Sequence, residues 1–329
     1  QNPVFPESEL ERLRKQRLAS IAQEKTDPFS IGWRLLPGIL FGKTHAYGNP
    51  LTGSGTEASV SAIARADLRK FHQTWFQPDN VTLIVVGDTT LEEILPKLES
   101  NLKGWQDRTD TPAKNVAAVP NPERSVLYLV DRPGAGQSSI IGGLIAPPLD
   151  TPDRLAIESM NRILGGSFTS RINMNLREDK HWAYGVQGFV YPVEQQVPYM
   201  IYAPVQADQT GPSIAAMTGD IKAFLGDKGI TQTELTRTIS GAIRELPGKF
   251  ETSADVLSGL ESIKRFDRPD NYYETLASRY RAMTAQELDA AARKAIDPAK
   301  ITWVVSGDGE KVKPQLDTLG LPVEVTAMA

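Results

Sequence analysis

The sequence predicts an α+β protein built from tandem repeats, each with a mostly antiparallel sheet flanked by helices. The first observation is an internal repeat: "RADLRKFHQTWFQPDNVTLIVVGD" ends at Asp88 and "TAQELDAAARKAIDPAKITWVVSGD" ends at Asp308, and the two align without gaps at an offset of 220 positions. The second is that β-rich runs interleave with amphipathic helices, expected for example over 151–164 and 212–225. The third is the occurrence of hairpin-like pairs of runs, which favours an antiparallel over a doubly wound sheet.

Each copy of the repeat predicts a helix, then a turn marked by Pro78 or Pro298, then a short strand closed by Gly-Asp. A second pair of segments, 5–21 and 230–246, matches at an offset of 225 positions, and both predict a helix behind a Ser/Thr-rich cap. Order and spacing therefore agree for several elements, which supports a true repeat.

The repeat spacing also predicts the domain organisation. The second copy starts near "SVLYLVDRPGAGQSSIIGGLIAP", where two strand-like runs surround a Gly-rich turn. By the same spacing the first copy would begin roughly 95 residues before the chain does. We expect residues 1–106 to be the C-terminal part of a first repeat whose N-terminus is truncated, 107–124 a linker rich in turn-forming residues, and 125–329 a complete second repeat.

Composition excludes several classes of protein. The 329 residues are 40% apolar and 23% charged, as expected for a globular chain of about two domains. The net charge of −4 does not indicate binding to nucleic acid or to an anionic membrane. No apolar run is long enough to span a bilayer. Cysteine is absent, which excludes disulfides, thiol catalysis and cysteine-bound zinc, and which suits both the cytosol and the bacterial periplasm.

Short catalytic motifs are also missing. The three histidines, His45, His72 and His181, are spaced for neither HExxH nor HxxEH. We expect His72 to lie on a helix surface or in packing, and His45 to make a polar contact in a loop. The run "PGAGQSS" (133–139) lacks the spacing and the lysine of a phosphate-binding loop, and we predict a tight hairpin turn there. No GxSxG nucleophile elbow is present.

One segment carries candidate chemistry: "LGGSFTSRINMNLREDKHWAYGV", residues 164–186. We expect a helix from about Gly166 to Asp179, followed by a strand that contains Tyr184. Two interpretations of Arg177 and Tyr184 stay open. In the first interpretation, Arg177 forms a salt bridge and Tyr184 is an ordinary strand residue. In the second, both side chains converge on a substrate carbonyl, where guanidinium and phenol donors stabilise a developing oxyanion.

Together these residues resemble the pitrilysin/insulinase family of zinc metallopeptidases, the inverzincins. Segment 164–186 is similar to the family's signature GGxxxSRL…LRE…GxxY. "FPESELERLRKQRLASIAQEKTDP" with the following "THAYGNPLTGS" resembles the stretch after the family's active-site helix, and "FQPDNVTLIVVGD" is also characteristic. The resemblance covers essentially the whole chain.

The resemblance implies tandem α/β repeats of the LuxS/MPP-like metallopeptidase type, with two halves enclosing an unfolded peptide. One half binds zinc through HxxEH and a distal glutamate, and the other contributes an arginine–tyrosine pair. By position in the motif, Arg177 and Tyr184 match that pair, and Gly165, Gly166 and Phe168 match substrate-binding positions. Ser20 stands where the distal glutamate is usual, with Glu24 as the less favoured alignment, so we expect this chain to bind no metal itself.

The expected function is therefore that of the C-terminal, non-zinc half of a metalloendopeptidase acting on peptides or unfolded proteins. Its partner would be a zinc-bearing HxxEH half, fused upstream or present as a separate subunit, and the chain alone would be inactive. The family resemblance implies the bacterial periplasm or cell envelope. Two alternatives stay open: a catalytically inactive scaffold or core subunit, as in respiratory complexes, and a peptide-binding module that pairs a peptide with a strand edge.

Overall fold

The computed structural model describes residues 2–106, 111–112, 116–148 and 154–327. The described residues form two compact units. Unit 1 lies within Gln1–Ile21, Gly55–Asn115 and Glu245–Asp270, and unit 2 lies within Ala22–Ser54, Val116–Arg244 and Asn271–Ala329. Part of the expected linker, at 107–110 and 113–115, lies outside the described residues. None of the helices in the described ranges is both long and apolar enough to cross a lipid bilayer.

Among the described residues, unit 2 contains one six-stranded sheet with the strand order β3-β4-β2-β5-β1-β6. The strands are β1 (Leu127–Asp131), β2 (Gln137–Ala146), β3 (Gln187–Val190), β4 (Val197–Gln206), β5 (Thr302–Gly307) and β6 (Val323–Val325). In this sheet the β3–β4, β4–β2 and β2–β5 pairs are antiparallel, whereas β1 is parallel to both β5 and β6. The α+β class with a mostly antiparallel sheet is confirmed.

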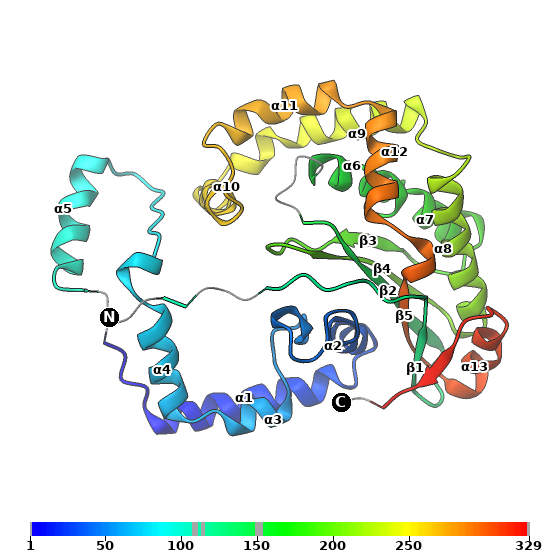
Figure 1. The fold of residues 1–329 in the computed structure, drawn as a ribbon, viewed down its shortest axis with the longest axis horizontal. Helices are drawn as coiled ribbons and strands as arrows, with labels where there is room; N and C mark the ends of the chain where they lie inside the picture. Colours follow the sequence, from blue (N-terminus) through cyan, green and yellow to red (C-terminus); the bar gives the residue numbers. More distant parts are fainter. Residues whose placement is uncertain (1, 107–110, 113–115, 149–153, 328–329) are drawn as a thin grey trace. The chain divides into compact units, whose positions relative to one another are not determined.

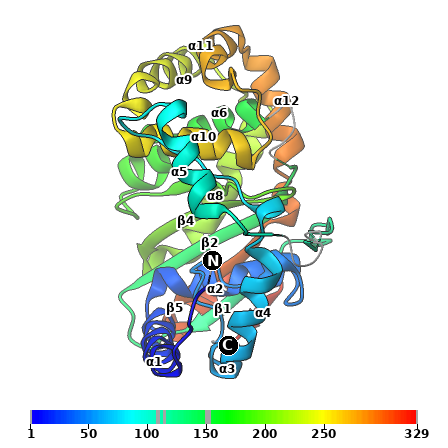
Figure 2. The same ribbon diagram turned by 90° about the vertical axis from the view of Figure 1, so that its left-hand side faces the viewer.

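Helices cover both faces of the sheet, as Figures 1 and 2 show. They are α2 (Pro28–Phe41), α6 (Arg154–Leu164), α8 (Thr210–Leu225) and α12 (Ala285–Ala295). Successive side chains of a strand point to opposite faces. Ile140 and Val305 therefore join the core formed with α6, α8 and α12, while Ile141 and Val304 pack against α2 on the other face. Each such side chain contributes roughly 1.5–3 kcal/mol through burial.

Local signals in the sequence determine where these helices begin. Asp27 caps α2 by accepting a hydrogen bond from the Ser30 amide at 2.7 Å, and Pro28 occupies the first helical position. At α12, Thr284 and Glu287 form a reciprocal capping box. Further helical elements that lie wholly or mainly in unit 2 include η1 (Ala46–Gly48), η4 (Ala207–Gln209), α9 (Gln232–Glu245), α11 (Tyr272–Ala282), η6 (Pro298–Lys300) and α13 (Gly309–Asp317).

Three expectations for helices can be compared with the structure. The helix expected over 212–225 forms as α8, and the one expected over 151–164 forms as α6 from Arg154, with 151–153 outside the described residues. The helix expected from Gly166 is wrong at its start. It begins only at Arg171, as α7 (Arg171–Asn173), and continues as the π-helical turn η3 (Met174–Asp179).

The hairpin expected at 133–139 is also wrong, although a turn is present. The turn joins β1 to β2, but these strands are not neighbours because β5 lies between them and pairs with both. Gly134 has a φ of 78°, which suits glycine, and its amide donates to Asp308 Oδ2 at 3.2 Å, just beyond the end of β5. A strand about 175 residues further along the sequence thus separates two runs that look like a hairpin.

Unit 1 is helical in its described part. Its elements are α1 (Glu7–Glu24, which continues into unit 2 after Ile21), α3 (Glu57–Ala62), α4 (Arg65–Trp75), η2 (Pro78–Asn80), α5 (Leu91–Leu102), η5 (Pro247–Phe250) and α10 (Ser253–Arg265). Arg14 of α1 donates to the carbonyls of Ser61 and Ile63 at 3.0 and 2.6 Å. These bonds attach α1 to the end of α3.

The strand expected over 81–86 does not form, which corrects the prediction from the repeat. Leu83 and Val85 are 52% and 47% exposed, while their counterparts in the second repeat, Trp303 and Val305, are 1% and 0% exposed. The strand β5 forms because β1 and β2 pair with its two edges. Residues 81–86 have no strand neighbour among the described residues, and a strand alone is not stable in water.

Candidate functional site

A pair of glycines ends α6 and begins the candidate site. A Cβ on Gly166 would lie 2.6 Å from Asn161 Nδ2, and one on Gly165 would lie 3.2 Å from the Cα of Gly188 in β3. The Gly188 amide donates to the Gly165 carbonyl at 2.8 Å, and Asn161 Nδ2 donates to the Gly188 carbonyl at 3.0 Å. The glycine pair thus permits the end of α6 to approach β3, where a larger residue would collide.

Arg177 lies in the π-helical turn that follows. The Lys180 amide bonds to the Asn175 carbonyl at 3.0 Å, five residues back, which is the spacing of a π-turn. The Arg177 guanidinium carbon lies 4.5 Å from the ring centre of Phe168, and Nε lies 3.0 Å from Glu178 Oε1. The side chain remains 39% exposed. The salt bridge of the first interpretation is present, and the guanidinium still reaches solvent.

The strand expected to contain Tyr184 is wrong at its start, because β3 begins only at Gln187 and Tyr184 lies on a short segment between the π-turn and β3. His181, with a φ of 57°, turns the chain out of the helix. The Trp182 amide then donates to the Leu176 carbonyl at 2.9 Å, and Ala183 forms an isolated bridge with Val205 of β4. The Tyr184 side chain is 85% exposed, so it is not sealed in the core.

Arg177 and Tyr184 line the same pocket, which has a volume of about 530 Å³. Arg177 also lines a neighbouring pocket of about 370 Å³. The other three residues that the resemblance implied line this second pocket: Gly165, Gly166 and Phe168. The structure therefore brings the five candidate residues to two adjoining cavities with Arg177 in the wall of both. The larger pocket is also lined by two polar side chains, Gln137 at the start of β2 and Gln206 at the end of β4.

The arginine of the signature's Ser-Arg pair was not singled out by the sequence, and its role is structural. Arg171 forms a two-point ion pair with Glu234 of α9, with Nε–Oε1 and Nη2–Oε2 distances of 2.7 Å, and donates to the carbonyls of Lys228 and Gly229. Burial raises the pKa of Glu234, but the hydrogen bonds from Arg171 and Thr231 outweigh burial and lower the pKa to about 2. The feature of the sequence that could have indicated a structural role for Glu234 is the capping pattern Thr231-x-x-Glu234.

Asp220 of α8 hydrogen-bonds to Asn175 in the π-turn, and its pKa predicts how the stability of the chain depends on pH. It accepts a hydrogen bond from Asn175 Nδ2 at 2.7 Å, and burial raises its pKa against the opposing effects of Asn175 and of Lys180, Arg171 and Lys228. A raised pKa in the folded state means that stability is lost as the pH rises through that pKa.

We expect Asp220→Asn to unfold at a higher urea concentration than the parent at pH 7, because the amide still accepts from Asn175 but carries no partly buried negative charge. Near pH 3, where Asp220 is neutral when folded and largely neutral when unfolded, the two midpoints should converge. The exposed Asp227→Asn is the matched control. An advantage of Asp220→Asn that is equally large at pH 3 and pH 7 would contradict the assignment.

The site holds no group of side chains suited to zinc. Among the described residues, no cluster of three or more His, Cys, Asp or Glu could bind a metal ion. The Ser20 hydroxyl donates to the Gln16 carbonyl at 3.1 Å. Glu24, the alternative ligand, accepts from Arg34 NH1 and from the Ser54 hydroxyl at 2.6 Å each. Burial raises the pKa of Glu24, but the hydrogen bonds from Ser54 and Arg34 produce a net lowering. Its carboxylate therefore belongs to an ion pair.

Two histidines have the structural roles expected of them. His72 of α4 stacks on Phe76 with ring centres 5.1 Å apart. His45 caps η1 by accepting from the Tyr47 amide at 3.0 Å, and its Nε2 lies 2.9 Å from the Ala117 carbonyl. The third, His181, lines the same pocket as Arg177 and Tyr184, with Nδ1 3.1 Å from the Arg177 carbonyl.

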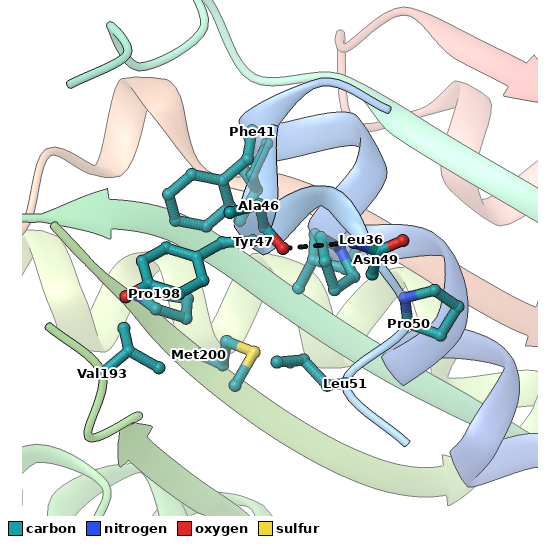
Figure 3. A pocket seen from close by; sticks show the side chains of 12 residues that line it. Leu36, Phe41, Ala46, Tyr47, Asn49, Pro50, Leu51, Val193, Pro198 and Met200 are labelled. Atoms are coloured by element: carbon teal, nitrogen blue, oxygen red, sulfur yellow. Dashed lines mark hydrogen bonds between the residues drawn. The ribbon is translucent and has the colours of Figure 1, made fainter. Parts of the chain in front are cut away.

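A separate apolar pocket of about 180 Å³ lies between α2, η1 and the start of β4 (Figure 3). Leu36, Phe41 and Met200 line it together with Tyr47, whose hydroxyl donates to the Glu194 carbonyl at 3.0 Å. The pocket with Arg177 and Tyr184 is lined by Pro204 and Gln206, at the opposite end of β4. The apolar pocket is thus distinct from the candidate site.

Known proteins share this fold and sequence pattern. The family model described as Peptidase M16 inactive domain matches residues 62–241, which is more than half of the chain. The non-peptidase homolog YmxG of Helicobacter pylori is 22% identical over 317 residues, covering 95% of this chain and 71% of that protein. The uncharacterized zinc protease YmxG of Bacillus subtilis is 25% identical over 232 residues, covering 70% of this chain and 54% of that protein. The chain thus spans roughly half to seven tenths of these relatives.

Solved structures agree. The peptidase M16 inactive domain from Pseudomonas fluorescens superposes with a TM-score of 0.83 at 25% identity, over 93% of this chain and 72% of that one. The first half of the periplasmic protease PqqL from Escherichia coli has the same fold, with a TM-score of 0.70 at 15% identity over 95% of this chain and 68% of that one. The chain therefore belongs to the peptidase M16 inactive-domain family of zinc protease-like proteins, the pitrilysin/insulinase group that its signature segment resembles.

Proposed function

We propose that this chain is the non-zinc half of a metalloendopeptidase and that Arg177 and Tyr184 contact the scissile peptide there. The observation that carries the proposal is that both side chains line one pocket while remaining open to solvent. The zinc-bearing HxxEH half would supply the activated water. In this proposal the chain acts on the substrate by stabilising the carbonyl oxygen that gains negative charge.

The chemistry of the two side chains suits that role. A guanidinium is always protonated and presents several N–H donors in a fixed plane, and a phenol adds one O–H donor. Donors already in place where an oxyanion develops stabilise the transition state more than the ground state. Stacking on Phe168 and pairing with Glu178 hold the Arg177 guanidinium in one orientation, which reduces the reorganisation needed during the reaction.

Apolar side chains of unit 1 support the proposed partner. Leu83 and Val85 are exposed where their counterparts in β5 lie between two strands. On α4 and α5, Phe71 and Leu91 are likewise exposed, at 58% and 68%. We propose that strands of the zinc-bearing half, equivalent to β1 and β2, pair with residues 81–86 and cover these side chains.

This proposal predicts the effect of a charge at position 83. Leu83→Asp should leave the thermal midpoint of this chain unchanged, because the side chain is exposed. It should abolish co-purification with the HxxEH-bearing half expressed as a separate polypeptide. Val325→Asp, at an apolar position of β6 that is 61% exposed, is the matched control and should co-purify normally. Normal co-purification of Leu83→Asp would exclude residues 81–86 as the contact.

The decisive assay for the function is cleavage of an unfolded peptide by the HxxEH half with and without this chain. We expect turnover only when both are present. If the HxxEH half alone is as fast as the mixture, the proposed role of this chain is wrong.

A second candidate is a catalytically inactive scaffold, favoured by the family's description as an inactive domain and by the name of the Helicobacter pylori relative. It predicts a stable complex whose turnover does not depend on Arg177 or Tyr184. A strand-edge peptide module has less support at β3, because Gly165 and Asn161 already occupy the outward backbone groups of Gly188.

For the compartment, we propose the bacterial periplasm or cell envelope. Support comes from the family resemblance and from the absence of cysteine, which suits a periplasmic protein but also a cytosolic one. Release of the native protein by osmotic shock would support the location, whereas retention with cytosolic markers would oppose it.

A further inference from the structure

Asn173 lines the pocket that contains Gly165, Gly166 and Phe168, and nothing in the signature assigned it a role. Asn173 belongs to α7, is 3% exposed, and precedes Arg177 by four residues on the same helical segment. We propose that Asn173 is the positioning residue that holds Arg177 and Tyr184 at a fixed separation. The inference rests on the proposed function of that pair.

The first contact runs to the loop that carries Phe168. Asn173 Nδ2 donates to the Phe168 carbonyl at 2.6 Å. The Phe168 ring is 59% exposed, so packing alone does not fix it, yet it supports the Arg177 guanidinium at 4.5 Å. The position of this ring therefore depends on the backbone of its loop, and Asn173 ties that backbone to the helix.

The second contact runs to the segment that carries Tyr184. Asn173 Oδ1 accepts from the Val186 amide at 2.8 Å. Because Tyr184 is almost fully exposed, its place also depends on its backbone. The bridge from Ala183 to Val205 holds that backbone on one side of Tyr184, and Asn173 holds it on the other.

One carboxamide thus links the helix of Arg177, the loop of Phe168 and the segment of Tyr184. The link needs a donor and an acceptor on the same side chain. Alanine supplies neither. An ionised aspartate keeps the acceptor for Val186 but places negative charge against the Phe168 carbonyl, whereas a protonated aspartate supplies both groups again.

The first test measures geometry in this chain alone. The Phe168 ring current shifts the Arg177 Nε–H resonance in a ¹H–¹⁵N spectrum, and Arg177→Lys identifies that signal. We expect Asn173→Ala and, at pH 7, Asn173→Asp to move it towards the position seen in Phe168→Leu. Because Arg177 Nε also pairs with Glu178, each variant is compared with the parent at the same pH. On acidification the Asn173→Asp signal should converge on that of the parent, which a loss of stability alone would not produce.

Asn121 provides a matched control, because its amide makes the same kind of double contact, to the Ile145 amide and carbonyl at 2.7 Å each. Asn121→Ala should lower the thermal midpoint while leaving the Arg177 signal in place. An unchanged Arg177 signal in both Asn173 variants, or an equal shift in Asn121→Ala, would overturn the positioning role.

The second test uses the assembled peptidase. Asn173→Ala should lower kcat on the order of 10-fold to 100-fold with little change in KM, since misplaced groups lose most in the transition state. A shifted Arg177 signal with unchanged kcat would keep Asn173 as the positioning residue and reject the catalytic role of the pair. An unshifted signal with reduced kcat would reject Asn173 as the positioning residue.

Discussion

Replacing Tyr184 by phenylalanine in the assembled peptidase should lower kcat by about 10²–10³-fold, because removing one donor to a developing oxyanion has that cost. Arg177→Ala should have at least as large an effect, since it also removes a positive charge. Tyr184 is so exposed that its hydroxyl contributes little to folding, and the thermal midpoint of Tyr184→Phe should match that of the parent. Steady-state kinetics on an unfolded peptide provides the measurement.

Arg177→Lys separates charge from geometry. Lysine keeps the charge but loses the planar group that stacks on Phe168, so we expect only a partial recovery over Arg177→Ala. Tyr273→Phe and Arg281→Ala, on α11 and away from the pocket, are the matched controls and should retain full activity. Full turnover in both Tyr184→Phe and Arg177→Ala would leave the inactive scaffold as the better account of this chain.

The Arg171–Glu234 ion pair has the largest expected effect on stability. Arg171→Ala should lower the free energy of unfolding by about 3 kcal/mol, because it removes the counter-charge of a largely buried carboxylate and the donors to the Lys228 and Gly229 carbonyls. Urea unfolding at pH 7 measures this difference. Asp317→Asn, at the exposed Lys313–Asp317 pair, is the control and should change stability by less than about 1 kcal/mol.

The same pair predicts a pH dependence with a definite sign. The pKa of Glu234 falls from its ordinary 4.5 to about 2 in the folded state, so its contribution is complete above pH 4.5 and is lost as the pH falls towards 2. The difference in stability between the parent and Glu234→Gln should therefore shrink between pH 5 and pH 3. A difference that stays constant over this range would show that the carboxylate charge does not carry the effect.

Elements with local signals were predictable from the sequence. Helix α8 appears where amphipathic periodicity predicted it, and α12 appears as the helix expected in the second copy of the repeat. The internal repeat also showed that β5 has a counterpart in sequence at 81–86. The signature motif also selected Arg177 and Tyr184, which the structure brings to one pocket.

The failures share one physical cause, which is dependence on distant partners. Residues 81–86 have the composition of a strand, but a strand forms only where neighbouring strands accept its backbone bonds. The turn at 133–139 looked like a hairpin because the sequence does not show that β5 inserts between β1 and β2. Arg171 and Glu234 are 63 residues apart, and no spacing rule connects them.

The π-helical turn has a consequence for how much length variation this part of the chain tolerates. Each residue of an α-helix advances by about 100° around the axis. Deleting one residue between Asn173 and Arg177 would let the segment wind as a regular α-helix and would turn the arginine about a quarter of a revolution away from the cavity it shares with Tyr184. An insertion in the loop after α9, by contrast, would leave that angle unchanged. Active natural variants should therefore keep the number of residues from Ser170 to Tyr184 constant, whereas the length of loops such as the one after α9 can vary.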